Sequence, residues 1–174
     1  YVVNAAGVVD HSADKKVFKA HYLGCKNLAN FFLKKKIKLF LQIGSCVEYG
    51  PQKSPQKEAY KIKKKKLKSM YSKGKFEASK YLIQLYKKHK FPVIVFRLYL
   101  NYGPNQDFNR FLPVIIDGCL KDKRFPCSSG MQYRSFTYID DLVRAMMIAF
   151  KKPDLSGNIF NIGNNMWNWF FYKL

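Results

Sequence analysis

Residues 39–50 read LFLQIGSCVEYG and residues 71–82 read YSKGKFEASKYL, and these two stretches decide the fold. The first continues an apolar run that predicts a buried strand over Ile37–Ile43, whose carboxyl end delivers Ser45 into a loop. The second predicts the first turns of a helix. A strand, a polar loop and a helix in this order indicate an α/β protein with its functional groups at the carboxyl ends of the strands.

Three side chains in these stretches can move a proton. Tyr71 and Lys75 stand four residues apart, so they share one face of the predicted helix, and Ser45 reaches the same edge of the sheet. A nearby cation lowers the pKa of a phenol from about 10 towards neutrality. The arrangement therefore predicts proton transfer to or from a hydroxyl or carbonyl oxygen, which the serine hydroxyl orients.

The spacing of Tyr71 and Lys75 has little weight by itself, because lysine is abundant. Five of the twelve tyrosines have a lysine four residues later: Tyr22, Tyr49, Tyr60, Tyr71 and Tyr86. Context distinguishes Tyr71, which follows a strand and a loop and shares its helix face with Ala78 and Leu82. The alternative interpretation is an ordinary solvated helix start.

Further strands and helices alternate along the chain. We expect strands over Tyr1–Ala6, Pro92–Leu98 and Asn158–Ile162, and helices from Asp14, from Tyr71 to about His89, near Phe108–Leu120 and from Asp141. This alternation predicts a doubly wound parallel sheet.

Five motifs give the chain a resemblance to a known family. They are NAAG at 4–7, GSCVEYG at 44–50, YSKGK at 71–75, RLYLNYGP at 97–104 and RSFTYIDD at 134–141. In this order they resemble the extended short-chain dehydrogenase/reductase family, the NAD-dependent epimerases and dehydratases of nucleotide sugars. The resemblance runs from about Val2 to Asn164 and implies a Rossmann-like fold with NAD or NADP as cofactor.

The resemblance also implies roles for individual residues. The catalytic residues would be Ser45, Tyr71 and Lys75. The cofactor contacts would be Ala5, Ala6, Gly7, Tyr71, Lys75, Tyr99 and Pro104. The contacts to a nucleotide-diphospho-sugar substrate would be Asn101, Arg110 and Arg134. No metal ligand is implied, and no Cys or His stands at metal-ligand spacing.

The chain departs from the family pattern at several of these places. His21 stands where relatives often have Asn, and we expect a structural histidine there. Cys46 and Val47 stand where the dehydratases carry an Asp-Glu pair, and Glu48 comes one place too late, where strand-like alternation would point it differently. Leu100 stands where relatives often have Asn or Gln, which weakens the role of Asn101.

The resemblance divides the chain at residue 99. We expect residues 1–99 to be a partial dinucleotide-binding domain and residues 100–174 part of a small substrate-binding lobe. None of the ten glycines forms the Gly-rich turn that holds a pyrophosphate. The chain is therefore expected to be an N-terminally truncated fragment, inactive alone.

The charge is strongly positive, since 32 Lys+Arg minus 11 Asp+Glu gives +21. Basic proteins attract anionic partners, but 27 of these residues are Lys and only five are Arg, the residue that suits specific phosphate or base recognition. Nucleic acid is therefore not the expected partner. KIKKKKLK at 61–68 is expected to be a solvated loop, with a phosphate-binding or nucleic-acid-binding tract as the alternative.

Cysteine usage and hydropathy indicate the compartment. The four cysteines (25, 46, 119 and 127) form no CxxC pair, so reduced thiols and a cytoplasmic location are expected. No apolar run approaches the roughly 20 residues that a membrane span needs. A homodimer through the helix that carries Tyr71 is a further expectation.

Two functions remain open. The first is an NAD(P)-dependent epimerase or keto-reductase of a nucleotide-diphospho-sugar. The second is a non-catalytic relative that binds RNA or a protein through its Lys-rich surface. The presence of Ser45, Tyr71 and Lys75 together favours the enzyme.

Overall fold

The computed structural model describes residues 1–8, 14–125 and 134–164 and divides the chain into two compact units. The first unit contains Tyr1–Leu98 and Arg144–Ile162, and the second contains Tyr99–Val143 and Gly163–Leu174. Within the described residues, no helix combines the length and the apolar character needed to cross a membrane.

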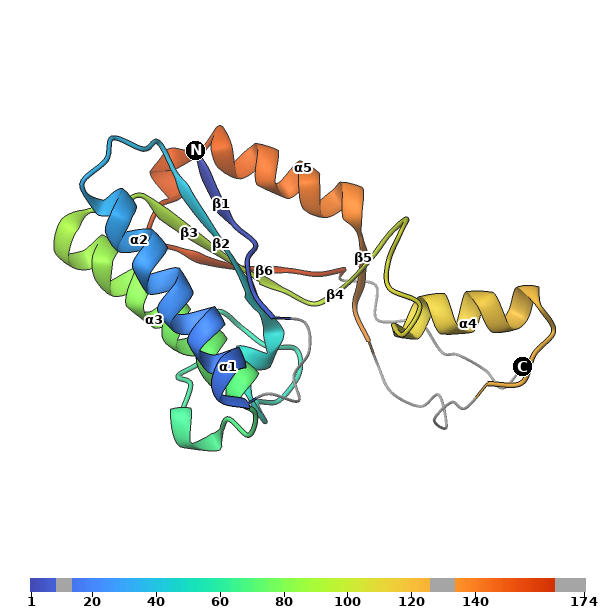
Figure 1. Cartoon of the computed structure of the whole chain (residues 1–174). Helices are drawn as coiled ribbons and strands as arrows, with labels where there is room; N and C mark the ends of the chain where they lie inside the picture. The colour runs from blue at the N-terminus through green and yellow to red at the C-terminus, as the bar shows by residue number, and fades with distance from the viewer. Residues whose placement is uncertain (9–13, 126–133, 165–174) are drawn as a thin grey trace. The chain divides into compact units, whose positions relative to one another are not determined.

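The first unit is built on a four-stranded parallel sheet with the order β1-β2-β3-β6 (Figure 1). The strands are Val2–Asn4, Phe40–Ser45, Val93–Leu98 and Ile159–Ile162. All four strands end at the same edge, because parallel strands share one direction. The predicted α/β class with a parallel sheet is confirmed.

The strand expected over Ile37–Ile43 lies further along the chain, as β2. It continues to Ser45 because its last residues pair with β3, where Ser45 lies opposite Leu98. Ser45 is thus the final residue of a strand and not a loop residue, and its backbone is fixed by the sheet. The residues after it form η2, a short 3₁₀ helix over Cys46–Tyr49.

Helices pack side by side next to this sheet (Figure 1). The first run consists of α1 (Asp14–Phe18), a π-helical segment η1 (Lys19–Gly24) and α2 (Cys25–Leu33). The second is the long helix α3 (Met70–His89). Ser69 begins α3 by accepting a hydrogen bond from the Ser72 N–H at 3.1 Å, and Lys90 ends it in a left-handed conformation at φ 56°.

The core of the first unit lies between these helices and the sheet. It consists of Cys25, Ala29, Phe40, Ala78, Leu82, Leu85, Phe91, Val93 and Val95. The buried residues of α3 recur every three or four positions, so burying this one face packs the helix on the sheet. The tyrosine and lysine at the start of α3 are thereby held at the carboxyl edge.

The Lys-rich segment between η2 and α3 has little regular structure apart from η3, a 3₁₀ turn over Lys64–Lys66. All eight of its lysines are exposed, at positions 53, 57, 61, 63, 64, 65, 66 and 68, as expected for a solvated loop. Leu67 is buried, which ties the loop to the body of the unit.

The second unit contains a two-stranded parallel sheet and helices. Strand β4 (Leu100–Tyr102) pairs with β5 (Phe136–Tyr138), and α4 spans Phe111–Leu120. Helix α5 (Ile139–Phe150) begins in this unit and ends in the first, and η4 (Pro153–Leu155) follows it. Residues 144–162, which we expected in the substrate lobe, lie in the first unit because β6 pairs with β3.

Candidate active site

The site begins at the carboxyl end of β1, where the NAAG turn follows. Asn4 is buried there and donates from Nδ2 to Gln42 Oε1 on β2 at 2.7 Å. Its Oδ1 accepts the backbone N–H of Ala6 at 3.3 Å. Asn4 therefore fixes the shape of the turn, which leaves Ala5 and Ala6 exposed for a ligand to approach.

Cys25 completes this polar cluster from α2. Its thiol donates to the same Oε1 atom of Gln42 at 3.2 Å, and its side chain is 2% exposed. Burial raises the pKa of the Cys25 thiol to about 12. The thiol therefore stays neutral at physiological pH and acts as a hydrogen-bond donor. No disulfide links Cys25, Cys46 and Cys119, and Cys127 lies outside the described residues.

His21 lies beneath the NAAG turn. A Cβ atom added at Gly7 would lie 2.2 Å from Cε1 of His21, so any larger residue at this position would force the imidazole to move. His21 is 6% exposed, and its Nε2 lies 3.3 Å from the carbonyl oxygen of Val8, which can only accept a hydrogen bond. His21 thus has the structural role that we expected.

His21 also contacts the proposed catalytic tyrosine. The rings of His21 and Tyr71 meet edge to face with centroids 4.9 Å apart. The π-helical segment that carries His21 is a feature that the sequence did not indicate, and π turns are frequent at functional sites. The NAAG turn and Tyr71 are therefore linked through one imidazole.

Lys75 is the most unusual lysine of the described residues, since its side chain is 5% exposed. Its Nζ donates to the carbonyl oxygen of Ile43 at 2.7 Å and lies 5.9 Å from the centroid of the Tyr71 ring. Burial lowers the pKa of Lys75, and the nearby Glu48 carboxylate opposes that shift. The structure thus places a buried cation one helical turn from Tyr71 and bound to β2 two residues before Ser45.

Ser45 joins β2 to η2 and forms the N-cap of that turn. Its hydroxyl accepts the N–H of Val47 at 3.4 Å, and its own N–H donates to Glu48 Oε1 at 3.0 Å. This is a capping box, in which side chain and backbone satisfy each other. A hydroxyl that accepts one bond retains its hydrogen for donation, so Ser45 can still direct a substrate oxygen.

The remaining predicted site residues belong to the second unit. Tyr99 lies between β3 and β4, and Asn101 in β4 donates from Nδ2 to the Tyr99 carbonyl at 3.2 Å. Pro104 is exposed after β4. Arg110 is the N-cap residue of α4, and Arg134 lies two residues before β5. Both arginines are exposed, so an anionic ligand could reach their guanidinium groups.

A buried ion pair next to Ser45 was not predicted from the sequence. Glu48 is completely buried and Arg97 is 3% exposed, with Arg97 Nε 2.9 Å from Glu48 Oε2. Burial raises the pKa of Glu48, and the Arg97 guanidinium opposes that shift. Burial alone would lower the pKa of Arg97, but the Glu48 carboxylate and the Tyr49 hydroxyl together more than offset this and the pKa is raised.

The expectation that strand alternation sets the direction of Glu48 was wrong, because residues 46–49 form a 3₁₀ helix that turns the carboxylate inwards. One signal in the sequence could have revealed the pair. Arg97 interrupts the otherwise apolar strand VIVFRL, and a buried arginine requires a buried acid.

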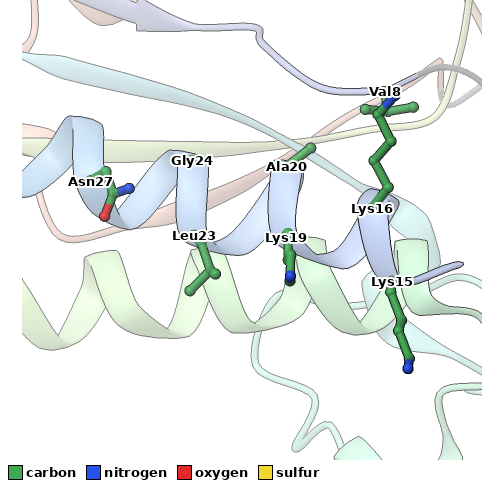
Figure 2. A pocket seen from close by; sticks show the side chains of 8 residues that line it. All are labelled: Val8, Lys15, Lys16, Lys19, Ala20, Leu23, Gly24 and Asn27. Atoms are coloured by element: carbon green, nitrogen blue, oxygen red, sulfur yellow. The ribbon is translucent and has the colours of Figure 1, made fainter. Parts of the chain in front are cut away.

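A hollow of about 640 Å³ lies elsewhere in the first unit (Figure 2). It follows α1 and η1 and is lined by Val8, Leu23 and three lysines, among other residues. Ser45, Tyr71 and Lys75 are not among the described residues that line it. The proposed chemistry therefore rests on the strand ends and not on this hollow.

The sequence and the structure of this chain are similar to those of known proteins. The dTDP-D-glucose 4,6-dehydratase of Homo sapiens is 31% identical over 132 residues, which cover 75% of this chain and 37% of that protein. The UDP-glucuronic acid decarboxylase 6 of Arabidopsis thaliana is 28% identical over 154 residues, 86% of this chain and 44% of that protein. The structure of dTDP-glucose 4,6-dehydratase from Bacillus anthracis in complex with NAD matches with a TM-score of 0.79 and 25% identity.

That structural match covers 94% of this chain and 50% of the Bacillus chain, so the present chain spans about half of that protein and less than half of the other two. The family described as "NAD dependent epimerase/dehydratase family" matches residues 1–163. The five motifs, the parallel sheet and the relatives among nucleotide-sugar enzymes agree with this match. The chain belongs to the NAD-dependent epimerase/dehydratase family.

Proposed function

We propose that the complete protein is an NAD-dependent epimerase or keto-reductase that acts on a nucleotide-diphospho-sugar. The observation that carries this proposal is the buried Lys75 ammonium, which is bound to Ile43 and lies one turn from Tyr71. A lysine is rarely buried without a partner or a task. Its position between a tyrosine and the serine at the end of β2 supports a proton-transfer role.

Each residue has a defined part in this chemistry. Tyr71 takes the proton from a sugar hydroxyl or returns it to a ketone, and Ser45 donates a hydrogen bond to the same oxygen. Lys75 stabilises negative charge on the Tyr71 oxygen through its ammonium. A bound nicotinamide cofactor supplies hydride transfer at the sugar carbon.

The residues present fit the nicotinamide end of such a cofactor. Tyr71 and Lys75 offer an O–H and N–H donors, which suit ribose hydroxyls, and the small residues Ala5 and Ala6 leave the end of β1 open. Tyr99 and Pro104 are proposed to border the nicotinamide, and Asn101, Arg110 and Arg134 to contact the sugar nucleotide.

The pyrophosphate end has no counterpart in the 174 residues, since no Gly-rich turn occurs in this sequence. Each charge-assisted hydrogen bond missing there is worth roughly 1.5–3 kcal/mol, and about 1.4 kcal/mol is tenfold in affinity. We therefore expect residues 1–174 alone to bind NAD no tighter than about millimolar and to turn over no sugar nucleotide. Calorimetry on this chain measures the affinity, and micromolar binding would contradict the proposed cofactor placement.

Cys46 and Val47 support epimerisation or reduction over the elimination of water. The half-buried thiol and the exposed isopropyl group cannot serve as the acid and base that eliminate water. An epimerase leaves the substrate mass unchanged, and a keto-reductase adds two hydrogens. Mass spectrometry distinguishes these outcomes, with nucleotide sugars incubated with the complete protein and NAD for epimerisation, and nucleotide keto-sugars incubated with the protein and NADH, the hydride donor, for reduction. A product lighter by one water would identify a dehydratase and contradict this assignment.

A second candidate function is binding of RNA through the exposed lysines at 61, 63–66 and 68. Lys-rich loops attract phosphates without sequence selectivity, so such binding would weaken steeply with salt. Fluorescence anisotropy with a single-stranded RNA at two salt concentrations tests it. Submicromolar binding at physiological salt would favour this candidate over the enzyme. A homodimer through α3 and a cytoplasmic location stay predictions.

A further inference from the structure

The Glu48 carboxylate serves two different partners with its two oxygens. Oε1 accepts the backbone N–H of Ser45 at 3.0 Å, and Oε2 accepts the Nε–H of Arg97 at 2.9 Å. One side of the carboxylate therefore faces the proposed catalytic serine, and the other faces the neighbouring strand β3.

Gly44 makes the space that this carboxylate occupies. A Cβ atom at Gly44 would lie 2.5 Å from Glu48 Oε1 and 3.0 Å from the carbonyl oxygen of Phe96, so the absence of a side chain at residue 44 makes the space. Glu48 itself is 0% exposed. The carboxylate is thus confined between the end of β2 and the end of β3.

The network continues from Arg97 across the sheet. The guanidinium carbon lies 4.5 Å from the centroid of the Tyr49 ring, and the Tyr49 hydroxyl donates to Asn161 Oδ1 on β6 at 2.7 Å. Asn161 in turn donates from Nδ2 to the Gln56 carbonyl at 2.9 Å. Three strands and the Lys-rich loop are therefore connected to the N–H of Ser45 through polar contacts.

We propose that Glu48 is a positioning residue, which, held by Arg97, fixes the backbone amide of Ser45 and thereby the direction of the Ser45 hydroxyl. This inference rests on the proposed function of Ser45. The hydroxyl accepts the N–H of Val47, and the turn that presents Val47 is closed by the same carboxylate. A further consequence is electrostatic, because the Glu48 charge favours the protonated form of the buried Lys75.

Two double variants of the complete protein separate positioning from simple stability. Both carry Arg97→Met, so neither leaves a buried arginine unpaired. One adds Glu48→Gln, which retains an oxygen acceptor for the Ser45 N–H. The other adds Glu48→Met, which offers no such acceptor. The two double variants differ only at residue 48, and therefore only in whether the Ser45 N–H has a side-chain acceptor.

The proposal predicts different behaviour of these two variants. The Ser45 amide, measured by hydrogen exchange, should exchange about tenfold faster or more in the double variant with Glu48→Met than in the one with Glu48→Gln, because its acceptor is gone. The kcat should be lower in the same variant by about tenfold or more, with KM for the sugar nucleotide unchanged. Rescue by glutamine is the signature of positioning.

Other results would overturn the proposal. Equal kcat values in the two double variants, with different amide exchange rates, would show that the hold on Ser45 does not matter for catalysis. Equal exchange rates would show that Glu48 does not hold the amide. If the variant with Glu48→Met does not fold, Glu48→Ala with Arg97→Met, which also lacks the acceptor, takes its place.

The Ser45→Ala variant distinguishes this inference from the proposed function itself. Full activity after Ser45→Ala would show that the serine has no catalytic role, and both ideas would fail together. Loss of activity after Ser45→Ala, with equal kcat values in the two double variants, would leave the proposed function intact and remove only the role of Glu48.

Discussion

Two tyrosine-lysine pairs with identical spacing, Tyr71/Lys75 and Tyr60/Lys64, lie in the same unit. They differ in the burial and in the partners of their side chains. Lys75 is 5% exposed and bound to a strand carbonyl, beside Tyr71 on a long helix. Lys64 is 56% exposed and pairs with Glu77 at 2.6 Å, while the Tyr60 hydroxyl donates to the Pro55 carbonyl in the Lys-rich loop. The spacing of a tyrosine and a lysine therefore does not indicate a function by itself. The two pairs are distinguished by the burial of the Lys75 side chain and by its hydrogen bond to a strand carbonyl.

The largest difference concerns the ion pairs near each lysine. Glu48→Ala would leave the Arg97 guanidinium buried without a partner, which we expect to lower the free energy of unfolding by about 3–5 kcal/mol. Lys64→Ala breaks a pair whose lysine is 56% exposed and whose glutamate is 15% exposed, and should cost roughly 0–1 kcal/mol. Urea unfolding of both variants checks this. Similar losses in the two would mean that the buried pair is no more important than the surface one.

The next difference is catalytic and concerns the two tyrosines. Tyr71→Phe in the complete protein removes the proposed proton carrier and should lower kcat by about 10² or more, with little change in substrate affinity. Tyr60→Phe is the matched control, since it also removes one hydroxyl from a tyrosine with a lysine four residues later, and its kcat should stay close to that of the parent. Steady-state kinetics decide. Equal losses would show that the wrong tyrosine has been chosen.

The smallest difference is a dependence of stability on pH. Burial lowers the pKa of Lys75 below the ordinary value of 10.5. The unfolded chain therefore binds more protons than the folded chain in the window between the lowered pKa and 10.5, so Lys75 makes stability rise with pH there. Lys75→Met should remove this rise, and Lys64→Met should keep it. Urea unfolding at a series of pH values up to 10.5 measures the slopes, and parallel curves for all three proteins would contradict the burial of Lys75.

The sequence predicted the strands and helices whose signals are local. The apolar run before Arg97 is strand β3, and the apolar face of Ala78 and Leu82 packs α3 on the sheet. The end of β2 was predicted two residues too early, because its last pairs depend on β3, whose sequence is about 50 residues away. Local patterns determine which element forms, whereas pairing determines where it ends.

The candidate site was predictable only in part for the same reason. The motifs predicted roles for Ser45 and Lys75, and the structure binds the lysine side chain near the end of the strand that carries the serine. The inward direction of Glu48 was not predicted, because its partner Arg97 lies on another strand. The contact of His21 with Tyr71 also depends on packing between two helices, which no single stretch of sequence encodes.

The π-helical segment Lys19–Gly24 has a consequence for sequence comparison. A π turn holds more residues than an α turn of the same rise, and each residue of an α-helix advances the side-chain direction by about 100°. Relatives with an uninterrupted α-helix here would align to this chain with a one-residue gap inside the segment. We expect that deleting one residue to regularise the helix would rotate α1 against α2 and change the contact of His21 with Tyr71, so a gap at this point would affect the candidate active site.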